Sequence, residues 1–373
     1  MTRRITADRR SFLVGAAAVG TAGLSGCLGL IGSEEDNDQQ NPFGQFGSGR
    51  EGRPEPGGTS IEDLPDLEGE LHVYSGRNEF LVGPLVDGLE DYYDDFELNV
   101  RYDGSSDLVN QISEAGDATE ADVFYTVDAS ALGALADEGL TRSISDDLAD
   151  LVPEQFRTDT WIGTSGRART VPYNTDAVDE SDLPDGIMDY PEFEGTLGWA
   201  PSYGSCQSFV AAMRQLEGDE ATREWLEGVV DAGIQEYDDE QLVTNAVNDG
   251  EIDAGFTNHY YIQRVIDGSS DPSIAAAFTE GDAGAVFNVA GATVTEAAAD
   301  PDLADAFVQH LLSAEAQEYF AVDTFEYPMI SGVDPYGELP PVDELNVPDI
   351  DLSELSNIEE TVDFMREVDG ITL

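Results

Sequence analysis

The sequence predicts an α/β fold of two lobes with a cleft between them, and three observations point to it. From residue 71 to residue 135, short apolar strands alternate with amphipathic helices in the order β-α-β-α-β. A second set of strands and helices follows from residue 161 onward. The length of 373 residues suits one large or two medium-sized domains. Alternation of this kind predicts a mostly parallel sheet with helices on both faces.

The elements of the first lobe follow from hydrophobic periodicity. Leucines and a tyrosine recur at helical spacing over 81–92, and apolar residues alternate with the period of a strand over 96–102. Besides these, we expect strands at 71–74 and 121–125 and helices at 108–115 and 129–135. Ligands of such sheets bind beyond the carboxyl ends of the strands. The loops after Tyr74, Tyr102 and Tyr125 are therefore the expected binding region.

The second lobe is predicted from the same patterns. Its set of elements comprises expected strands at 161–173, 196–200, 252–256 and 286–294, and helices at 220–230, 241–247, 303–311 and 355–365. The chain is expected to cross between the lobes near 166–171 and 285–289. This gives a first lobe of residues 70–168 with 286–330, and a second lobe of residues 169–285 with 331–373.

The charge of the chain is extreme, with 78 acidic residues against 16 basic ones and a formal net charge of −62. Every basic residue is an arginine. Such a charge disfavours nucleic acid and anionic lipid headgroups as partners, because both are bound by lysine and arginine. The 40% of hydrophobic residues is too high for a disordered acidic chain. Acidity spread over the whole length resembles that of proteins from salt-loving archaea, in which carboxylates keep the surface hydrated.

The N-terminus predicts export and membrane anchoring. Residues 1–26 contain Arg9-Arg10, which follows the twin-arginine export pattern, and an apolar run of about a dozen residues, too short to span a bilayer. The sequence Leu24-Ser25-Gly26-Cys27 resembles a lipobox, in which Cys27 is lipidated; a chance cysteine after an ordinary signal is the alternative. Residues 27–69 are rich in Gly, Pro and acidic residues and predict a disordered tether. The expected location is the extracellular face of the membrane.

Five short motifs occur in order along the body of the chain, and together they resemble one family. They are Val73-Tyr74-Ser75-Gly76-Arg77-Asn78-Glu79, Ala121-Asp122-Val123-Phe124-Tyr125, Ser165-Gly166-Arg167-Ala168-Arg169, Gly198-Trp199-Ala200-Pro201 and Asn258-His259-Tyr260-Tyr261. In order and spacing they are similar to the ferric-ion-binding proteins of periplasmic iron uptake, over roughly residues 70–372. The resemblance implies the two-lobed, type II-like periplasmic-binding-protein fold with its ligand cleft between the lobes. It also implies a monomer without enzymatic activity, with an ABC permease and its ATPase as partners.

The family binds Fe³⁺ through the phenolate oxygens of tandem tyrosines, and the resemblance assigns this role to Tyr260 and Tyr261. Fe³⁺ is a small, highly charged ion that favours anionic oxygen ligands. Tyr203 stands where a tyrosine-rich branch of the family has a third phenolate ligand. Packing without ligation is the alternative for Tyr260 and Tyr261, and the role of an aromatic that only lines the cleft is the alternative for Tyr203. The pair Tyr92-Tyr93 lies on a predicted amphipathic helix and is expected to pack.

The family also uses a synergistic anion, often carbonate, and the resemblance points to Arg77 and Arg167 as its partners. Arginine suits a planar oxyanion because it donates paired hydrogen bonds. Six further residues are candidates for the cleft, namely Asn78, Asp128, Arg101, Arg169, Asn258 and Ser205; surface ion pairing is the alternative for Arg101 and Arg169. Asn78 and Val127 depart from the family, whose members often have His and Glu ligands at these points.

Two other functions compete with iron binding. The same fold could bind an anion such as phosphate, sulfate or thiamine phosphate, a reading that arginines without tyrosines would favour. An anchored hydrolase is the second alternative, but the sequence contains neither Gly-x-Ser-x-Gly nor His-Glu-x-x-His.

Overall fold

The computed structural model describes residues 52–350, 352, 355 and 358–373. The predicted signal sequence, the predicted lipidation site Cys27 and most of the predicted tether lie outside these residues. None of the described helices combines the length and the apolar character that crossing a membrane requires.

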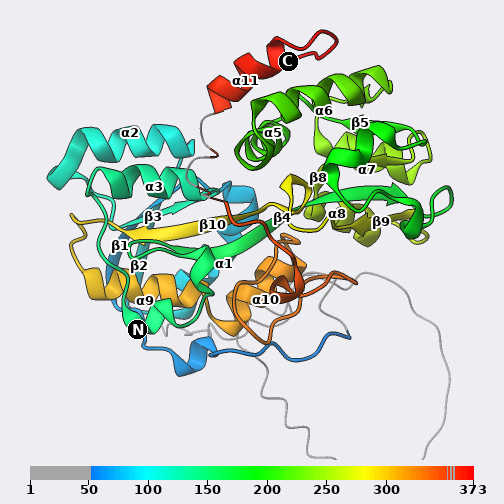
Figure 1. The fold of residues 1–373 in the computed structure, drawn as a ribbon. Helices are drawn as coiled ribbons and strands as arrows, with labels where there is room; N and C mark the ends of the chain where they lie inside the picture. The colour runs from blue at the N-terminus through cyan, green and yellow to red at the C-terminus, as the bar shows by residue number, and fades with distance from the viewer. Residues whose placement is uncertain (1–51, 351, 353–354, 356–357) are drawn as a thin grey trace, which may run out of the picture.

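In the described part of the chain, the strands join in a ten-stranded mixed sheet that extends through both lobes (Figure 1). The strands on the first-lobe side, in spatial order, are β2 (Phe96–Tyr102), β1 (Gly69–Ser75), β3 (Val123–Thr126), β10 (Phe287–Val294) and β4 (Ile162–Asn174). On the second-lobe side, β7 (Ala254–Gly255), β5 (Leu197–Trp199) and β6 (Gln235–Glu236) continue from β4, which also pairs with β8 (Thr257–Asn258) and β9 (Ile274–Ala277). The β1, β2 and β3 strands are parallel as predicted, whereas β10 is antiparallel to both of its neighbours.

Strand β4 belongs to both lobes. Its first part pairs with β10 as far as Ala168, and its second part pairs with β8 from Arg169 and with β9 from Val171. The strand has 13 residues and so reaches about 40 Å. Its pairing therefore changes within the segment 166–171, where the sequence predicts a crossing, while the full lobe boundaries remain a prediction.

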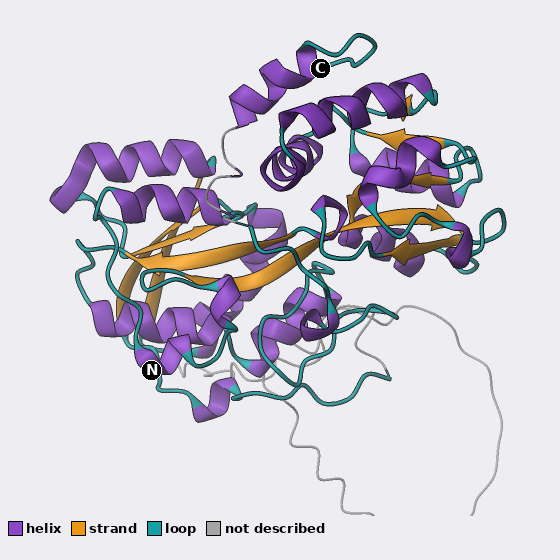
Figure 2. Ribbon diagram, viewed as in Figure 1, coloured by secondary structure: helices purple, strands orange, loops and turns teal. Residues whose placement is uncertain are grey.

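Helices cover both faces of the sheet in the first lobe and lie around the strands of the second lobe (Figure 2). Those of the first lobe are α1 (Glu79–Tyr92), α2 (Ser105–Ala115), α3 (Ala129–Asp137), α4 (Asp146–Ala149), α9 (Pro301–Leu311) and α10 (Ala314–Val322). Those of the second lobe are α5 (Gly204–Glu217), α6 (Asp219–Asp231), α7 (Glu240–Asn248), α8 (His259–Gly268) and α11 (Ile358–Arg366). Helix α11 returns to the second lobe, where Arg214 of α5 contacts both Thr361 and the ring of Phe364.

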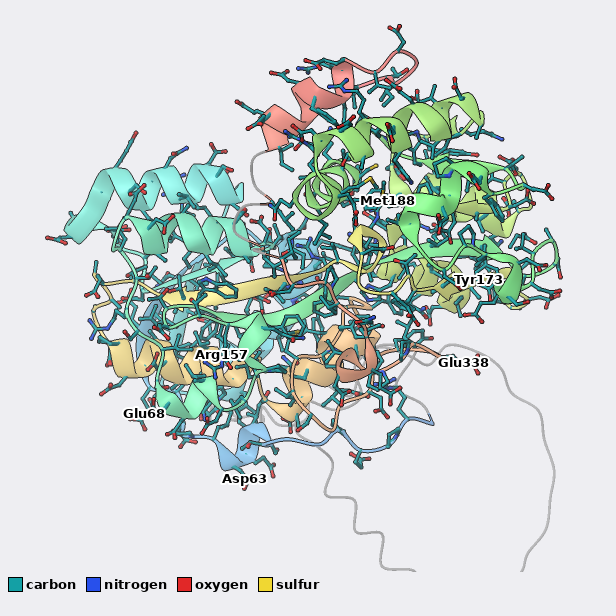
Figure 3. All side chains as sticks on the ribbon, in the orientation of Figure 1. Asp63, Glu68, Arg157, Tyr173, Met188 and Glu338 are labelled. Carbon is teal, nitrogen blue, oxygen red and sulfur yellow. The ribbon has the colours of Figure 1, made fainter. Side chains whose placement is uncertain are left out.

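The helices that the sequence predicts bury the apolar faces of their periodic patterns, whereas α10 is buried on all sides. In α1, Val82, Leu85, Val86 and Leu89 are buried against the sheet, and each such side chain contributes about 1.5–3 kcal/mol on leaving water. Acidic residues lie on the surface, in loops as well as on helices, as the exposed Asp63, Glu68 and Glu338 illustrate (Figure 3). The division is that of a globular core beneath an anionic surface.

Residues 52–69 differ from the predicted disordered tether, because they pack against α10. Ile61 and Leu67 are buried, and the backbone N–H of Ile61 donates to the Glu315 carboxylate at 2.9 Å. Arg53 forms an ion pair with Glu318 at 3.0 Å. The segment is polar overall, which predicts disorder, but its few apolar residues are buried against the folded domain.

Gly166 on β4 gives a test of the packing at the crossing. A Cβ atom at this position would lie 2.0 Å from Cζ of the buried Phe287 and 3.2 Å from Sδ of Met329. We expect Gly166→Ala to lower the free energy of unfolding by roughly 1–3 kcal/mol, as overpacking does. Gly268→Ala is the matched control, since a Cβ there meets nothing within 4 Å. Equal unfolding free energies for the two variants, measured by denaturant titration in concentrated salt, would contradict this packing.

Candidate functional site

Three tyrosines from two helix starts meet in the second lobe. Tyr203 precedes α5 as its N-cap residue, and Tyr260 and Tyr261 lie in the first turn of α8. The hydroxyl oxygens of Tyr203 and Tyr261 are 2.8 Å apart, and the ring centroids of Tyr260 and Tyr261 are 4.4 Å apart. The structure therefore brings together the three residues that the resemblance assigns to the metal. We call them the tyrosine cluster.

The local fold places these tyrosines by ending a strand immediately before each helix. Tyr203 follows β5 through a turn in which its N–H donates to the Ala200 carbonyl at 3.0 Å. Asn258 ends β8 and serves as the N-cap residue of α8, and its side-chain amide donates to the Tyr260 hydroxyl at 3.3 Å. Both helix starts lie beyond strand ends, where ligands of α/β sheets bind.

A buried carboxylate, that of Glu240, ties the elements around the cluster together. It is 0% exposed, and its Oε1 accepts hydrogen bonds from Arg169 of β4 and from Ser205 of α5. Its Oε2 accepts the backbone N–H of Asn258 at 2.9 Å. A buried ion pair is stable only when further hydrogen bonds satisfy its charges, and Glu240 has them. Arg169, Ser205 and Asn258 thus hold the framework of the site, and their place in a ligand cleft stays a prediction.

The phenols of Tyr260 and Tyr261 are neutral in the absence of a ligand. Burial raises the pKa of Tyr260, although the positive charge of Arg167 opposes the shift. Burial also raises the pKa of Tyr261, with smaller contributions from neighbouring Tyr260 and from the hydrogen bond with Tyr203. The positive end of the α8 dipole favours negative charge at these positions. Any ligand that takes phenolate oxygens must therefore displace protons, and the helix start assists it.

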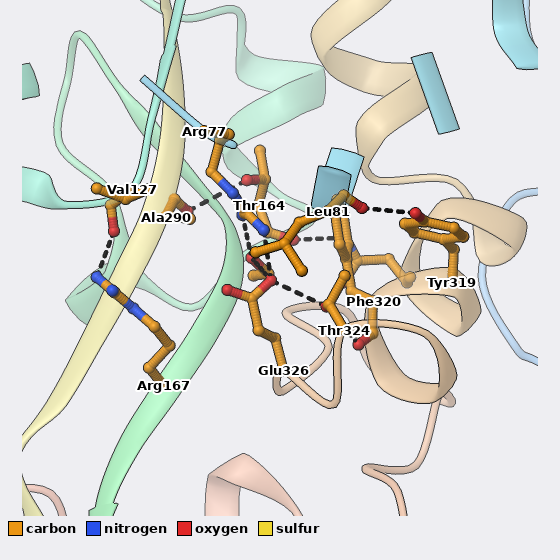
Figure 4. A network of polar contacts seen from close by, with 12 residues as sticks. Arg77, Leu81, Val127, Thr164, Arg167, Ala290, Tyr319, Phe320, Thr324 and Glu326 are labelled. Atoms are coloured by element: carbon orange, nitrogen blue, oxygen red, sulfur yellow. Dashed lines mark hydrogen bonds and ion pairs between the residues drawn. The ribbon is translucent and has the colours of Figure 1, made fainter. Parts of the chain in front are cut away.

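Arg167 lies on β4, the strand that crosses between the lobes, and only some of its N–H groups have described hydrogen-bond partners. One terminal nitrogen donates to the Val127 carbonyl in the loop after β3 (Figure 4). Its Nε is buried, and no hydrogen-bond partner for it occurs among the described residues. Arg167 also lies close enough to Tyr260 to affect its pKa. Of the two predicted anion partners, it is the one that keeps a free donor near the cluster.

The prediction that Arg77 holds an anion conflicts with its surroundings. Its side chain is 1% exposed, and its guanidinium donates to Ser165 at 2.8 Å and to Glu326 at 2.6 Å (Figure 4). Burial alone would raise the pKa of Glu326, but Arg77, Arg167 and the hydrogen bond from Ser165 together outweigh it, and the net shift is downward. Arg77 is therefore neutralised by an internal carboxylate, which leaves it no charge to offer an external anion.

Three further candidates from the sequence have other roles. Asn78 and Asp128 are N-cap residues of α1 and α3, with side-chain oxygens that accept backbone N–H groups at 2.9 and 3.1 Å. Arg101 is exposed on β2, with its guanidinium carbon 5.4 Å from the ring centroid of Tyr74. Asn78 and Asp128 are polar because a helix begins at the next residue in each case, and their side chains cap its first N–H groups.

Sequence reasoning missed three residues at or near the site. Glu240 and Glu326 are the buried acids of the two ion pairs. Nothing in the sequence separates Glu240 from the other carboxylates, whereas Glu326 stands in Phe325-Glu326-Tyr327-Pro328, a segment that is similar to the family but to which the sequence assigns no role. Arg264 lies over the rings of Tyr260 and Tyr261, with its guanidinium carbon 5.1 and 5.4 Å from their centroids. Its spacing of four residues from Tyr260 within a helix was the signal that could have found it.

The donor set of the cluster is made of oxygen atoms. Among the described residues, no group of three His, Cys, Asp or Glu side chains could hold a metal ion. His259, next to the cluster, accepts the N–H of Ala168 at Nδ1, and burial lowers its pKa to about 4, so it is neutral. A separate surface hollow of about 710 Å³, lined by residues such as Asp182, Glu192 and Asp253, does not include the tyrosines. A hard cation at the phenols is the chemistry that this arrangement can support.

Comparisons with known proteins agree with the fold. A family model described as bacterial extracellular solute-binding protein matches residues 85–343. The Fe(3+)-binding periplasmic protein of Serratia marcescens is 28% identical over 303 residues, covering 79% of this chain and 89% of that protein. Iron-bound HitA from Pseudomonas aeruginosa matches with a TM-score of 0.68 and 30% identity, over 80% of this chain and 99% of that chain.

A further solved structure, Trichodesmium FutA (IdiA) in complex with iron and citrate, matches with a TM-score of 0.69 and 26% identity. The match covers 81% of this chain and 100% of that chain. The predicted two-lobed α/β periplasmic-binding-protein fold is thereby confirmed.

Glu240→Gln tests the role of the buried carboxylate. The substitution keeps the shape but leaves the Arg169 guanidinium without its counter-charge, so we expect the free energy of unfolding to fall by about 3–5 kcal/mol. Glu367→Gln is the matched control, because it removes an exposed partner of Arg223 and is expected to cost about 0–1 kcal/mol. Denaturant titration of both variants measures the difference, and a loss below 1 kcal/mol for Glu240→Gln contradicts the assignment.

Proposed function

The chain belongs to the bacterial extracellular solute-binding protein family, and on that premise we propose that it captures Fe³⁺ at Tyr203, Tyr260 and Tyr261. Members of this family bind solutes for transport and are not enzymes, which sets the hydrolase alternative aside. The observation that carries the proposal is the meeting of three phenol groups from two helix starts, with the Tyr203 and Tyr261 oxygens 2.8 Å apart.

The chemistry of three phenols suits a trivalent cation. Once deprotonated, they supply three anionic oxygens, which together balance the charge of Fe³⁺. A bound trivalent ion displaces the phenol protons even where burial has raised the pKa, as at Tyr260 and Tyr261. A neutral asparagine at position 78 and a valine at position 127 offer no comparable ligand from the first lobe.

A synergistic anion, carbonate or similar, completes the proposed coordination, with Arg167 as its protein partner. Arg167 has an unpartnered Nε among the described residues and lies close to Tyr260. The iron and citrate in the Trichodesmium structure are consistent with an anion beside the metal in a relative. Arg77 no longer belongs to this proposal, because Glu326 neutralises it.

Delivery of the iron would follow from closing and opening of the two lobes. Strand β4 joins them, and η8 (Ala283–Ala285) leads directly into β10 at the second predicted crossing. Hinge motion of this kind encloses ligands in two-lobed binding proteins. The proposed acceptor is an ABC permease with its ATPase, which a monomer anchored through Cys27 after twin-arginine export would reach on the extracellular face. The acidic surface fits a haloarchaeal source.

A visible charge-transfer band tests the iron ligands. Titration of the apo-protein in concentrated salt with chelated Fe³⁺ is expected to produce a tyrosinate-to-iron band at one equivalent. Loss of one phenol oxygen should weaken iron binding by ~10- to 100-fold or more, because changes to residues that only support the ligands already have an effect of this size. The variants are Tyr260→Phe, Tyr261→Phe and Tyr203→Phe. Tyr237→Phe, which alters a tyrosine of the same lobe outside the cluster, is the matched control.

Two outcomes of that titration would overturn the proposal. One is the absence of a band in the unsubstituted protein. The other is a band that survives unchanged in the Tyr260→Phe/Tyr261→Phe double variant. Saturable phosphate or sulfate binding without iron would instead support the anion-binding alternative.

Proton release gives an independent test. The pKa values of Tyr260 and Tyr261 are raised, so these phenols are protonated at neutral pH and must lose their protons to bind iron. The apparent affinity is therefore expected to fall as the pH falls, by about tenfold per pH unit for each proton released. An indicator dye in weak buffer measures the release, with the iron chelate alone as the blank. Affinity that is independent of pH between 6 and 8 would count against phenolate ligation.

A further inference from the structure

Arg264 of α8 covers the tyrosine cluster without a role in the functions described so far. It follows Tyr260 by four residues and Tyr261 by three, a spacing that places side chains on one face of a helix. Helical side chains extend back toward the helix start, so the guanidinium lies over both rings. The distances from its central carbon to the two ring centroids are 5.1 and 5.4 Å.

The surroundings of Arg264 set it apart from most other arginines of this acidic chain. Arginines with a carboxylate within ion-pair distance are Arg53, Arg77, Arg142, Arg169, Arg214, Arg223 and Arg366. Arg264 forms no such pair with any residue in the described part of the chain, and its contacts there are the two tyrosine rings. Arg264 is half-buried in a chain with 78 acidic residues, yet it faces aromatic rings and not a carboxylate. We take this as a cation–π interaction with the two tyrosine rings.

We propose that Arg264 is a positioning residue of the tyrosine cluster, which packs both rings in place and holds a fixed positive charge beside them when they bind iron as phenolates. The inference rests on the proposed function. It also closes the charge count, because Fe³⁺ with three phenolates is neutral and Arg167 and Arg264 together balance a doubly charged anion. A partly buried site without that balance would carry an uncompensated charge, which is costly.

A fixed charge beside the rings has consequences that packing alone does not. It stabilises the electrons of the phenolates, so the energy needed to transfer one of them to iron increases. It also favours the reduced, less positive state of the metal. Loss of the charge should therefore move the charge-transfer band to longer wavelength and lower the reduction potential of the bound iron.

The test compares iron-loaded full-length variants by visible spectroscopy and spectroelectrochemistry, with chelated Fe³⁺ as the probe. We expect Arg264→Gln to shift the band to longer wavelength and to lower the potential, and Arg264→Lys to retain most of both values because it keeps the charge. Arg223→Gln is the matched control. It removes an arginine that stacks on a ring elsewhere, with its guanidinium carbon 4.6 Å from the Phe364 centroid, and should leave both values unchanged.

The outcomes separate this inference from the proposed function. If the unsubstituted protein shows the band, and Arg264→Gln has the same band position and the same reduction potential of the bound iron, the role of Arg264 is overturned. Iron binding by the tyrosines is then unaffected. Equal shifts in Arg264→Gln and Arg264→Lys reduce the role to packing and also overturn it. The absence of any band in the unsubstituted protein defeats the proposed function itself.

Discussion

The arrangement of the tyrosine cluster depends on one buried ion pair, that of Glu240 with Arg169. Burial of two charges is unfavourable unless every remaining hydrogen-bonding position is satisfied. Here the carboxylate receives Arg169 from β4, Ser205 from α5 and the backbone N–H of Asn258 before α8. The same group therefore fixes both helix starts that carry tyrosines against the strand that crosses between the lobes. The geometry of the candidate metal site is a consequence of satisfying this one carboxylate.

Strand β4 links the Glu240–Arg169 ion pair to the first lobe. Three alternate residues of the strand have polar side chains, and each contacts a different region. Ser165 bonds to Arg77 and Glu326 in the first lobe, Arg167 reaches the Val127 carbonyl beyond β3, and Arg169 bonds to Glu240 in the second lobe. One strand thus connects the two buried ion pairs with Arg167, which lies between them, forms no ion pair with a described residue and has a buried Nε without a described hydrogen-bond partner. Movement of the lobes about this strand would carry Arg167 relative to the phenols.

The sequence predicts most of the first-lobe elements, because hydrophobic periodicity and strand alternation are local properties. It does not predict α5 and α8, whose starts carry the tyrosines, nor α4 and α10. It places Tyr203, Tyr260 and Tyr261 in one site, although through a family resemblance and not through spacing. It fails where the outcome depends on which carboxylate meets which arginine, as for Arg77 with Glu326 and Arg169 with Glu240, since 78 acids offer no local distinction. The sequence also suggests Asn78 and Asp128 as possible cleft residues, although their positions before α1 and α3 already fit helix capping.

Binding of a ferric ion to the oxygens of Tyr203, Tyr260 and Tyr261 can be observed by anomalous X-ray diffraction from crystals of the iron-loaded protein, recorded on both sides of the iron absorption edge. We expect one strong peak within coordination distance of the three phenol oxygens, with the Arg167 side chain beside it. A peak in the acidic hollow near Asp182 and Asp253, or no peak at the tyrosines, would contradict this expectation.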